Sequence, residues 1–561
     1  MRFHQLFLIL GVSLFAVSCG LLSIHLKVET PKKPGAYPPL NRHMQLLAAN
    51  TKKRTAYDVH YYRLRLNPNP QKKYLQGTVL MRAKALQVID TIQVDLYPNL
   101  KVCRVSMNDS LVLYTRVDGA IWITPPKKIK TGEQFEITIQ YEGKPRVAEK
   151  PPWKGGVVWK KDKAGLPWCG VACESEGASL WWPNKDDVAD EADSTDVYIT
   201  VNNGLKAVSN GVLKEVQAQN NNTTTFHWHV SYPINNYNVT YYIGNFECLN
   251  DTFVSEINGR TIPLSYYVLP NHSGVAKDHF QQVKKHLAFY EDKFGPYPWP
   301  RDGYKLIESP YAGMEHQSAI AYGNGYKNGG DGFDYIILHE TAHEWWGNSV
   351  SAADLADGWI HEGFASYAEA LYVEKQFGRQ AYLRYMFWQR ITILNKKPVV
   401  RQRERRYFSY SDEDIYSKGS WVLHSLRTTM NNDTLFFDLL KSFRMNYHQK
   451  QILSEEFIAY VNQKTKRDYT WFFRQYLFRR EAPVLEYYWV GEKFFYRWTG
   501  VEKEFDKLPV ELTFTTHKET IYPSLEVQTL AVKLEPGNEV HFSDDRAYFG
   551  YRQNKELLKQ K

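Results

Sequence analysis

The 561-residue sequence has few cysteines, five in all, and it contains neither an internal repeat nor a low-complexity tract. So few cysteines exclude the disulfide framework of a small secreted domain. A large excess of one charge is also missing. The 70 Lys and Arg nearly balance the 61 Asp and Glu, and the formal net charge of +9 is small for this length. The basic residues are scattered and form no patch of the kind that binds nucleic acid, so we expect no nucleic-acid partner.

Two of the cysteines, Cys169 and Cys173, are close in the sequence, and a disulfide between them is one alternative. We expect isolated, buried or idle thiols instead. No cysteine stands at zinc-ligand spacing from a second cysteine and a histidine pair, so the cysteines predict no metal site.

Material for hydrophobic cores is abundant, with 43% hydrophobic residues, 16 Trp, 39 Tyr and 28 Phe. A mean hydropathy of -0.50 and 23% charged residues exclude both a disordered chain and a multi-span membrane protein. At about 100 to 200 residues per domain, this length predicts three or four domains.

The N-terminus has a long apolar run, from Leu6 to Val17, after a short basic start, which is typical of an export signal. The segment Ala-Val-Ser-Cys that ends at Cys19 resembles the lipobox of bacterial lipoproteins, in which the cysteine carries the lipid. The alternatives are an ordinary cleaved signal and an uncleaved anchor over residues 6–26, a stretch without charged residues. We expect a lipoprotein of the bacterial periplasm or cell surface; the lysines after residue 26 favour the alternative of a cytosol-facing anchor.

Periodic patterns divide the rest of the chain. Apolar and polar residues alternate in short segments such as 62–66 and 79–83, which predicts an all-β domain. Helical periodicity follows over 278–294, 333–349, 361–377 and 417–430, and alternation returns at 510–514. The expected organisation is 1–26 signal or membrane anchor, 27–54 Pro- and Lys-rich spacer, 55–255 N-terminal β domain, 256–482 mainly helical domain, 483–545 C-terminal β module and 546–561 charged tail.

The strongest chemical signal is His339-Glu-Thr-Ala-His343 within an apolar segment that we expect to be helical. A spacing of four residues puts both imidazoles on one helix face, where they can take two corners of a tetrahedral zinc site. Glu362 stands 19 positions after His343, at the start of another expected helix, and can supply a third ligand. Two His and one Glu leave the fourth position for water, as in catalytic zinc sites.

A Glu 19 residues after His-Glu-x-x-His is the zinc signature of the gluzincin metallopeptidases. The surrounding residues, from His339 to Asn348 and from Glu362 to Tyr367, resemble the aminopeptidase N family, which includes leukotriene hydrolase. Three further segments agree with this family: 181–186 (Trp-Trp-Pro-Asn-Lys-Asp), 313–316 (Gly-Met-Glu-His) and 416–419 (Tyr-Ser-Lys-Gly). The resemblance implies a multidomain α+β fold with an N-terminal all-β domain, a thermolysin-like, mainly helical catalytic domain and a small C-terminal β module.

The resemblance implies catalytic roles for the matching residues. It implies one zinc ion per chain, held by His339, His343 and Glu362. Glu340 is then the general base that takes a proton from a zinc-activated water. Tyr416 donates a hydrogen bond to the oxyanion, with Tyr410 as its nearest competitor.

The resemblance also implies a site for the free amine of a peptide. Glu315 occupies the Glu of the Gly-x-Met-Glu segment, and Glu174 matches an acid or amide that the family brings from its N-terminal domain. Glu176 is the alternative to Glu174. Tyr311 either walls the pocket for the first side chain of the substrate or is an ordinary packed aromatic. The expected substrate-binding residues are Glu315, Glu174, Gly313, Met314 and Tyr311.

Three further positions bear on the geometry of the expected site. His316 replaces the Asn that is usual after the Glu of the Gly-x-Met-Glu segment, which affects how one side of the substrate is held. His361 replaces the Asn that is usual before Glu362, and the turn of about 100° between neighbouring helix residues predicts that it faces away from the zinc. Glu369 is either an acid that orients a zinc-ligating histidine or a solvated acid.

Together these signals predict a zinc-dependent aminopeptidase that acts on peptides with a free N-terminus and is held at a membrane by its N-terminal lipid or helix. One alternative is a related zinc hydrolase of a non-peptide substrate such as an epoxide. The other is an inactive binding protein on the same fold. No oligomeric state is predicted.

Overall fold

The computed structural model describes residues 46, 51–403, 414–505, 507–514, 517–532 and 540–559. The expected signal or anchor, Cys19, almost all of the spacer and Tyr410 lie outside the described residues. Within the described part of the chain, no helix is both long enough and apolar enough to cross a membrane.

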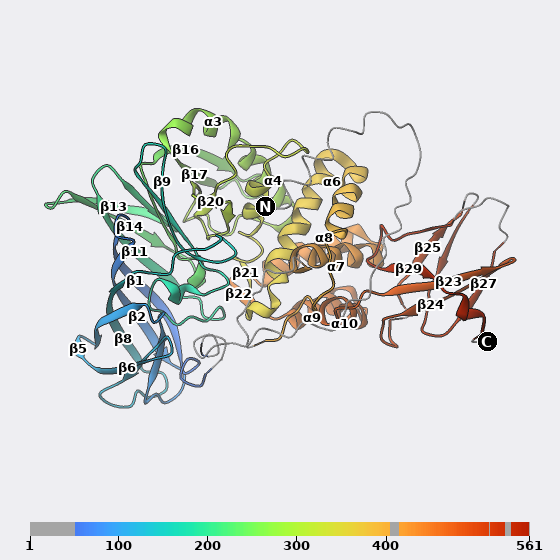
Figure 1. Cartoon of the computed structure of the whole chain (residues 1–561), viewed down its shortest axis with the longest axis horizontal. Helices are drawn as coiled ribbons and strands as arrows, with labels where there is room; N and C mark the ends of the chain where they lie inside the picture. Colours follow the sequence, from blue (N-terminus) through green and yellow to red (C-terminus); the bar gives the residue numbers. More distant parts are fainter. Residues whose placement is uncertain are drawn as a thin grey trace.

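The N-terminal domain is built from β-strands, which occupy the blue to blue-green end of the molecule (Figure 1). Its largest sheet has the strand order β13-β14-β11-β1-β2-β8-β4-β5. In β1, buried apolar residues such as Leu64 and Leu66 alternate with exposed Arg65, so one face of the sheet packs on the core. The elements are β1 Tyr57–Asn69, β2 Tyr74–Ala85, β3 Ile92–Asp95, β4 Leu100–Met107, β5 Ser110–Leu111, β6 Leu113–Val117, β7 Ala120–Thr124, β8 Gln134–Gly143, β9 Gly156–Lys161, β10 Pro167–Ala172, η1 Ala178–Leu180, β11 Ser194–Asn202, β12 Lys206–Ser209, β13 Val212–Gln219, β14 Thr223–Val230, η2 Asn236–Asn238 and β15 Tyr241–Gly244.

The central domain combines a five-stranded sheet, in the order β16-β17-β18-β20-β19, with a set of helices. The helices α6 to α10 lie between this sheet and the C-terminal strands (Figure 1). The elements are β16 Glu247–Val254, β17 Thr261–Val268, η3 Pro270–His272, α3 Ser273–His279, α4 Gln282–Phe294, β18 Tyr304–Glu308, β19 Gly313–Met314, β20 Ile320–Tyr322, α5 Tyr335–Ala342, β21 Val350–Ala352, η4 Leu355–Asp357, α6 Trp359–Arg390, α7 Asp414–Met430, α8 Asp433–Asn446, β22 Lys450–Ile452, α9 Ser454–Thr465 and α10 Thr470–Phe478.

The C-terminal module contains two small sheets among the described residues, β27-β24-β23-β29 and β26-β25-β28. Its buried residues belong to the same hydrophobic cluster as those of the helical domain, so the two share one continuous core. Tyr476 on α10 donates a hydrogen bond to the carbonyl of Tyr548 at 2.9 Å across this contact. The elements are β23 Val484–Val490, β24 Lys493–Thr499, β25 Val510–Thr513, β26 Lys518–Ile521, β27 Gln528–Ala531, β28 His541–Phe542, β29 Gly550–Gln553 and η5 Lys555–Lys559.

The structure corrects three of the expected boundaries. The β domain ends after β15, because β16 pairs with β17 of the next sheet and not with the strands before it. The expected tail contains β29, which pairs in parallel with β23 and therefore belongs to the C-terminal module. The expected spacer cannot extend to residue 54, because the side chain of Arg54 is fully buried. Composition alone did not reveal these three features, since they depend on which strands pair and on the burial of one side chain.

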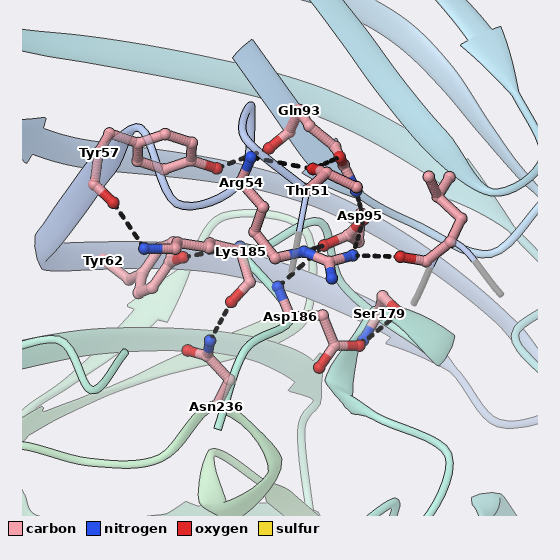
Figure 2. A network of polar contacts seen from close by, with 11 residues as sticks. Thr51, Arg54, Tyr57, Tyr62, Gln93, Asp95, Ser179, Lys185, Asp186 and Asn236 are labelled. Atoms are coloured by element: carbon pink, nitrogen blue, oxygen red, sulfur yellow. Dashed lines mark hydrogen bonds and ion pairs between the residues drawn. The ribbon is translucent and has the colours of Figure 1, made fainter. Parts of the chain in front are cut away.

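Arg54 lies at the centre of a buried polar network (Figure 2). Its guanidinium donates two hydrogen bonds to Asp95, at 2.9 and 3.1 Å. The backbone N–H of Asp186 donates to the same carboxylate at 3.1 Å. The Asp186 side chain in turn accepts from the backbone and the hydroxyl of Ser179, at 3.0 and 2.6 Å. The network therefore joins the start of the fold to the loop around η1.

Cys169 and Cys173 are buried and are not disulfide-bonded, so the expectation of isolated thiols is confirmed. Burial raises the pKa of both thiols, that of Cys169 to about 12, which keeps them protonated at neutral pH.

Candidate metal centre and substrate site

Helix α5 positions the first two candidate ligands. The helix begins at Asp334, whose carboxylate caps it by accepting a hydrogen bond from the backbone N–H of Ile336 at 3.1 Å. His339 lies one turn before His343 on the same face, and their Nε2 atoms are 3.1 Å apart. Glu362, on the first turn of α6, places its Oε2 atom 3.3 Å and 3.5 Å from these two nitrogens.

The three donor atoms fit a zinc ion. Tetrahedral zinc with bonds of about 2.0–2.2 Å has ligand atoms about 3.3–3.6 Å apart, which is close to the three distances in the structure. Glu362 Oε2 is buried and has no hydrogen-bond partner among the described residues. An unpartnered buried carboxylate oxygen facing two imidazoles is what a cation would satisfy.

The other ring nitrogens of both histidines are held by buried acceptors. His339 donates from Nδ1 to Glu369 at 2.5 Å, and Tyr385 also hydrogen bonds to this carboxylate. His343 donates from Nδ1 to the carbonyl of Trp346 at 2.9 Å. These bonds fix the tautomer in which both Nε2 atoms carry lone pairs toward the same point. Glu369 therefore lies against a candidate ligand and is not a solvated acid.

Glu340 is buried beside the three donors. Burial, the largest influence, raises the pKa of its carboxyl to about 7, and Glu362 and Glu174 act in the same direction. Gly313 on β19 lies directly against it: a Cβ atom at this position would sit 2.3 Å from Glu340 Oε1. Because Gly313 has no side chain, the carboxylate of Glu340 has room at this position.

Tyr416 reaches the centre from helix α7. Its ring stacks on that of His339, with centroids 6.1 Å apart. Burial, together with Glu362, Glu174 and Glu315, raises the pKa of Tyr416 well above 10, so the phenol remains a hydrogen-bond donor. Helices α6 and α7 cross closely here. A Cβ added to Gly419 on α7 would lie only 2.9 Å from the Cα of Gly363 on α6.

A second cluster of buried polar groups lies next to the centre. One ligand atom each from Glu174, Glu315 and His361 lie within 4.8 Å of one another. Glu176 is held elsewhere, by Arg146 at 3.2 Å and by the backbone N–H of Gly155 at 2.9 Å. Of the two acids in this loop, the structure thus brings Glu174 to Glu315.

Sequence reasoning missed two residues that contact Glu315. Tyr237, on η2, donates a hydrogen bond to Glu315 Oε1 at 3.1 Å. Asn348 donates to the backbone carbonyl of Glu315 at 2.9 Å. Asn348 lies in the segment that carried the family resemblance, so the sequence did contain a pattern that pointed to this residue. Tyr237 lies in an Asn-rich loop of the N-terminal domain, and no sequence pattern pointed to it.

The two histidines that replace asparagines occupy different environments. His316 is fully buried with Nδ1 2.6 Å from the hydroxyl of Tyr242, and burial lowers its pKa to about 3, so it is neutral. His361 is outside the donor set of the metal centre, as expected, and its Nε2 accepts from the backbone N–H of Ala352 at 2.9 Å.

Tyr311 and Met314 are both buried at the contact between the two larger domains. Tyr311 donates from its hydroxyl to the carbonyl of Val171 on β10 at 2.8 Å. This bond ties the segment before β19 to the N-terminal domain.

Known proteins share this arrangement. Residues 279–476 match the peptidase family M1 domain. A crystal structure of a two-domain M1 zinc metallopeptidase mutant bound to L-arginine superimposes on 73% of this chain and 91% of its own, with 25% identity and a TM-score of 0.63. This chain therefore contains a peptidase family M1 domain. A second M1 structure, a mutant from Deinococcus radiodurans bound to a Tyr-Ser-Ala substrate, covers 76% of this chain and 95% of its own with 23% identity and a TM-score of 0.64.

Curated relatives of this chain carry aminopeptidase names. Aminopeptidase B of Rattus norvegicus is 25% identical over 368 residues, which cover 62% of this chain and 53% of the rat protein. Endoplasmic reticulum aminopeptidase 1 of the same species is 26% identical over 251 residues, 41% of this chain and 26% of that protein. The match thus spans about half or less of these two relatives.

Proposed function

We propose that this chain is a zinc-dependent aminopeptidase that hydrolyses the N-terminal residue from peptides, with one zinc ion per chain. The observation that carries the proposal is a buried pair of acids, Glu174 and Glu315, next to the three zinc-compatible donors. A zinc hydrolase needs the donors alone. The acid pair adds a site for a cation immediately beside them, and a peptide's free α-amine, with a pKa of about 8, is such a cation at neutral pH.

The chain's own residues divide the chemistry among them. Zinc held by His339, His343 and Glu362 would lower the pKa of a bound water towards about 7 and polarise the scissile carbonyl. Glu340 accepts the proton of the attacking water and delivers it to the leaving amine. Tyr416 donates a hydrogen bond to the carbonyl oxygen as it becomes negative.

The acid pair makes the enzyme an exopeptidase. Glu315 and Glu174 accept hydrogen bonds from the substrate's ammonium and close the groove on its N-terminal side. One residue then fits between them and the scissile bond, and internal peptide bonds are excluded. Met314 and Tyr311, which are buried next to Glu315, contribute to the pocket for that residue.

The test uses the full chain purified in detergent and a panel of aminoacyl p-nitroanilides and tripeptides. We expect turnover that a zinc chelator abolishes and added zinc restores, and about one equivalent of zinc by metal analysis. N-acetylated versions of the best substrates are the matched controls, and they should be cleaved at least about a hundredfold more slowly, because the ammonium is gone.

Three outcomes would contradict the proposal. Efficient cleavage of N-acetylated peptides at internal bonds would indicate an endopeptidase. Turnover of an epoxide but of no aminoacyl substrate would support the non-peptide alternative. Zinc binding without any turnover would support a binding protein on the same fold.

We also propose that residues 1–26 hold the enzyme at a membrane, with Cys19 as the lipid site of a bacterial periplasmic or cell-surface lipoprotein. The support is the apolar run and the lipobox-like segment that ends at Cys19. Cys19→Ser should release the enzyme from membranes or block its processing. Membrane retention of a fully processed Cys19→Ser protein would indicate an uncleaved helix instead.

A further inference from the structure

Behind the acid pair lies His361, the residue before the candidate ligand Glu362. The side chain is 1% exposed. Since its Nε2 accepts the backbone N–H of Ala352 at 2.9 Å, the neutral ring carries its proton on Nδ1. This Nδ1 lies 3.7 Å from Glu174 Oε1 and has no hydrogen bond among the described residues. The β21 backbone thus fixes a ring whose free donor faces one of the two acids.

Tyr237 directs a hydrogen-bond donor at the other acid, Glu315. Its hydroxyl donates to Glu315 Oε1 at 3.1 Å, and its ring stacks on His361 with centroids 6.5 Å apart and planes 23° apart. Tyr237 is 2% exposed, so both rings of the pair are buried. Each acid therefore has one donor of this pair facing one of its oxygens.

We propose that His361 is a positioning residue that orients the carboxylate of Glu174 toward the substrate's α-amine. The proposal rests on the proposed function, because it assigns Glu174 to amine binding. Glu174 comes from a loop of the N-terminal domain, whereas Glu315 and His361 belong to the central domain, so a contact between Glu174 and His361 relates the two acids across the domain contact. His361 makes that contact through Nδ1–H. A separation of 3.7 Å is longer than a hydrogen bond, so the proposal requires this contact to shorten when substrate binds, as catalytic hydrogen bonds often do.

A positioning role predicts effects on amine binding rather than on chemistry. In the proposed mechanism Glu174 binds the amine, whereas Glu340 transfers the proton and Tyr416 donates to the oxyanion. Loss of its orientation should therefore raise KM for substrates with a free amine and leave kcat nearly unchanged. It should also raise the inhibition constant of the free amino acid, which carries the same ammonium.

Two conservative substitutions separate the two nitrogens of His361. Asn places its amide where Nδ1 lies and keeps a donor toward Glu174, but it loses the bond to Ala352. Gln reaches the position of Nε2 and keeps that backbone bond, but it loses the donor. We expect His361→Asn to stay within about threefold of the wild type and His361→Gln to raise KM and the amino-acid inhibition constant about tenfold, the effect of one lost hydrogen bond to a charged group.

The experiment measures KM, kcat, bound zinc and thermal stability for the full chain and both variants. N-acetyl amino acid, which lacks the ammonium, serves as the control inhibitor and should bind all three proteins alike. In a Glu174→Gln background the difference between Asn and Gln at position 361 should disappear, because His361 acts through Glu174. A purely structural role predicts the reverse order, since Gln preserves the bond to the backbone.

The inference is wrong if His361→Gln keeps wild-type KM, if Asn is as damaging as Gln, or if the effect persists in the Glu174→Gln background. It is also wrong if the wild type binds two zinc ions and His361→Gln releases one, because the cluster of Glu174, Glu315 and His361 would then be a metal site. These outcomes differ from a failure of the proposed function, in which the wild type cleaves no aminoacyl substrate.

Discussion

Replacing Gly419 by Ala tests whether the crossing of α6 and α7 sets the position of Tyr416. The new Cβ would lie 2.9 Å from the Cα of Gly363 and 3.5 Å from the Cβ of Trp359. Carbon atoms prefer separations of about 3.5–4.0 Å, so the helices must move apart by about 0.6–1.1 Å. Tyr416 lies one turn earlier on α7 and moves with it. Since a misplacement of about 1 Å at a reacting centre can cost about 100-fold, kcat should fall about 10- to 100-fold.

The assay is steady-state hydrolysis of an aminoacyl p-nitroanilide, with zinc content and thermal unfolding measured on the same samples. Zinc should stay bound, because no ligand lies on α7. Overpacking should cost about 1–3 kcal/mol in the free energy of unfolding. Gly274→Ala is the matched control, since it adds the same methyl group to helix α3 at a position with no atom within 4 Å. A wild-type kcat in Gly419→Ala would refute the reasoning that the close crossing positions the oxyanion donor.

Four further predictions concern single residues. His343→Ala removes one of three candidate ligands, so metal analysis should find little zinc and activity should be lost with it; retention of a full equivalent would exclude His343 as a ligand. Glu340→Gln should keep its zinc and lower kcat at least about a hundredfold, since only proton transfer is lost, and a wild-type rate would refute the mechanism. Tyr416→Phe should lower kcat about 100- to 1,000-fold at unchanged zinc content, and an unchanged rate would move the oxyanion role to Tyr410. Arg54→Met leaves Asp95 buried without its cation and should cost about 3–5 kcal/mol in urea unfolding, whereas Arg82→Met, at an ion pair whose arginine is half exposed, should cost less than about 1 kcal/mol; equal losses would contradict the burial argument.

The grouping of the candidate zinc ligands was predictable because its information is local. His339 and His343 are one helical turn apart, so the helix alone brings their nitrogens together. Glu362 follows after a fixed spacing, and the family resemblance points to it as a ligand. The multidomain α+β architecture was likewise accessible from alternation and helical periodicity.

What the sequence could not reveal depends on contacts between distant segments. The choice between Glu174 and Glu176 is decided by Arg146 and Gly155, which hold Glu176 away from the acid pair. Tyr237 reaches Glu315 across 78 residues of sequence, and no local pattern marks that contact. The same reason explains the error at the C-terminal boundary, because β29 is assigned by its pairing with the distant β23.

The burial of Arg54 sets a limit for protein engineering. Its guanidinium also donates to the backbone carbonyl of Leu46 at 3.0 Å, and its backbone N–H bonds to Thr51. A soluble, tag-bearing version for crystallisation must therefore begin before Leu46, even though residues 27–54 look dispensable from composition. A start at Tyr57 would delete the cation and leave the buried carboxylate of Asp95 without its ion-pair partner. Any tag or surface-attachment point belongs upstream of Leu46, where it leaves the contacts of Arg54 intact.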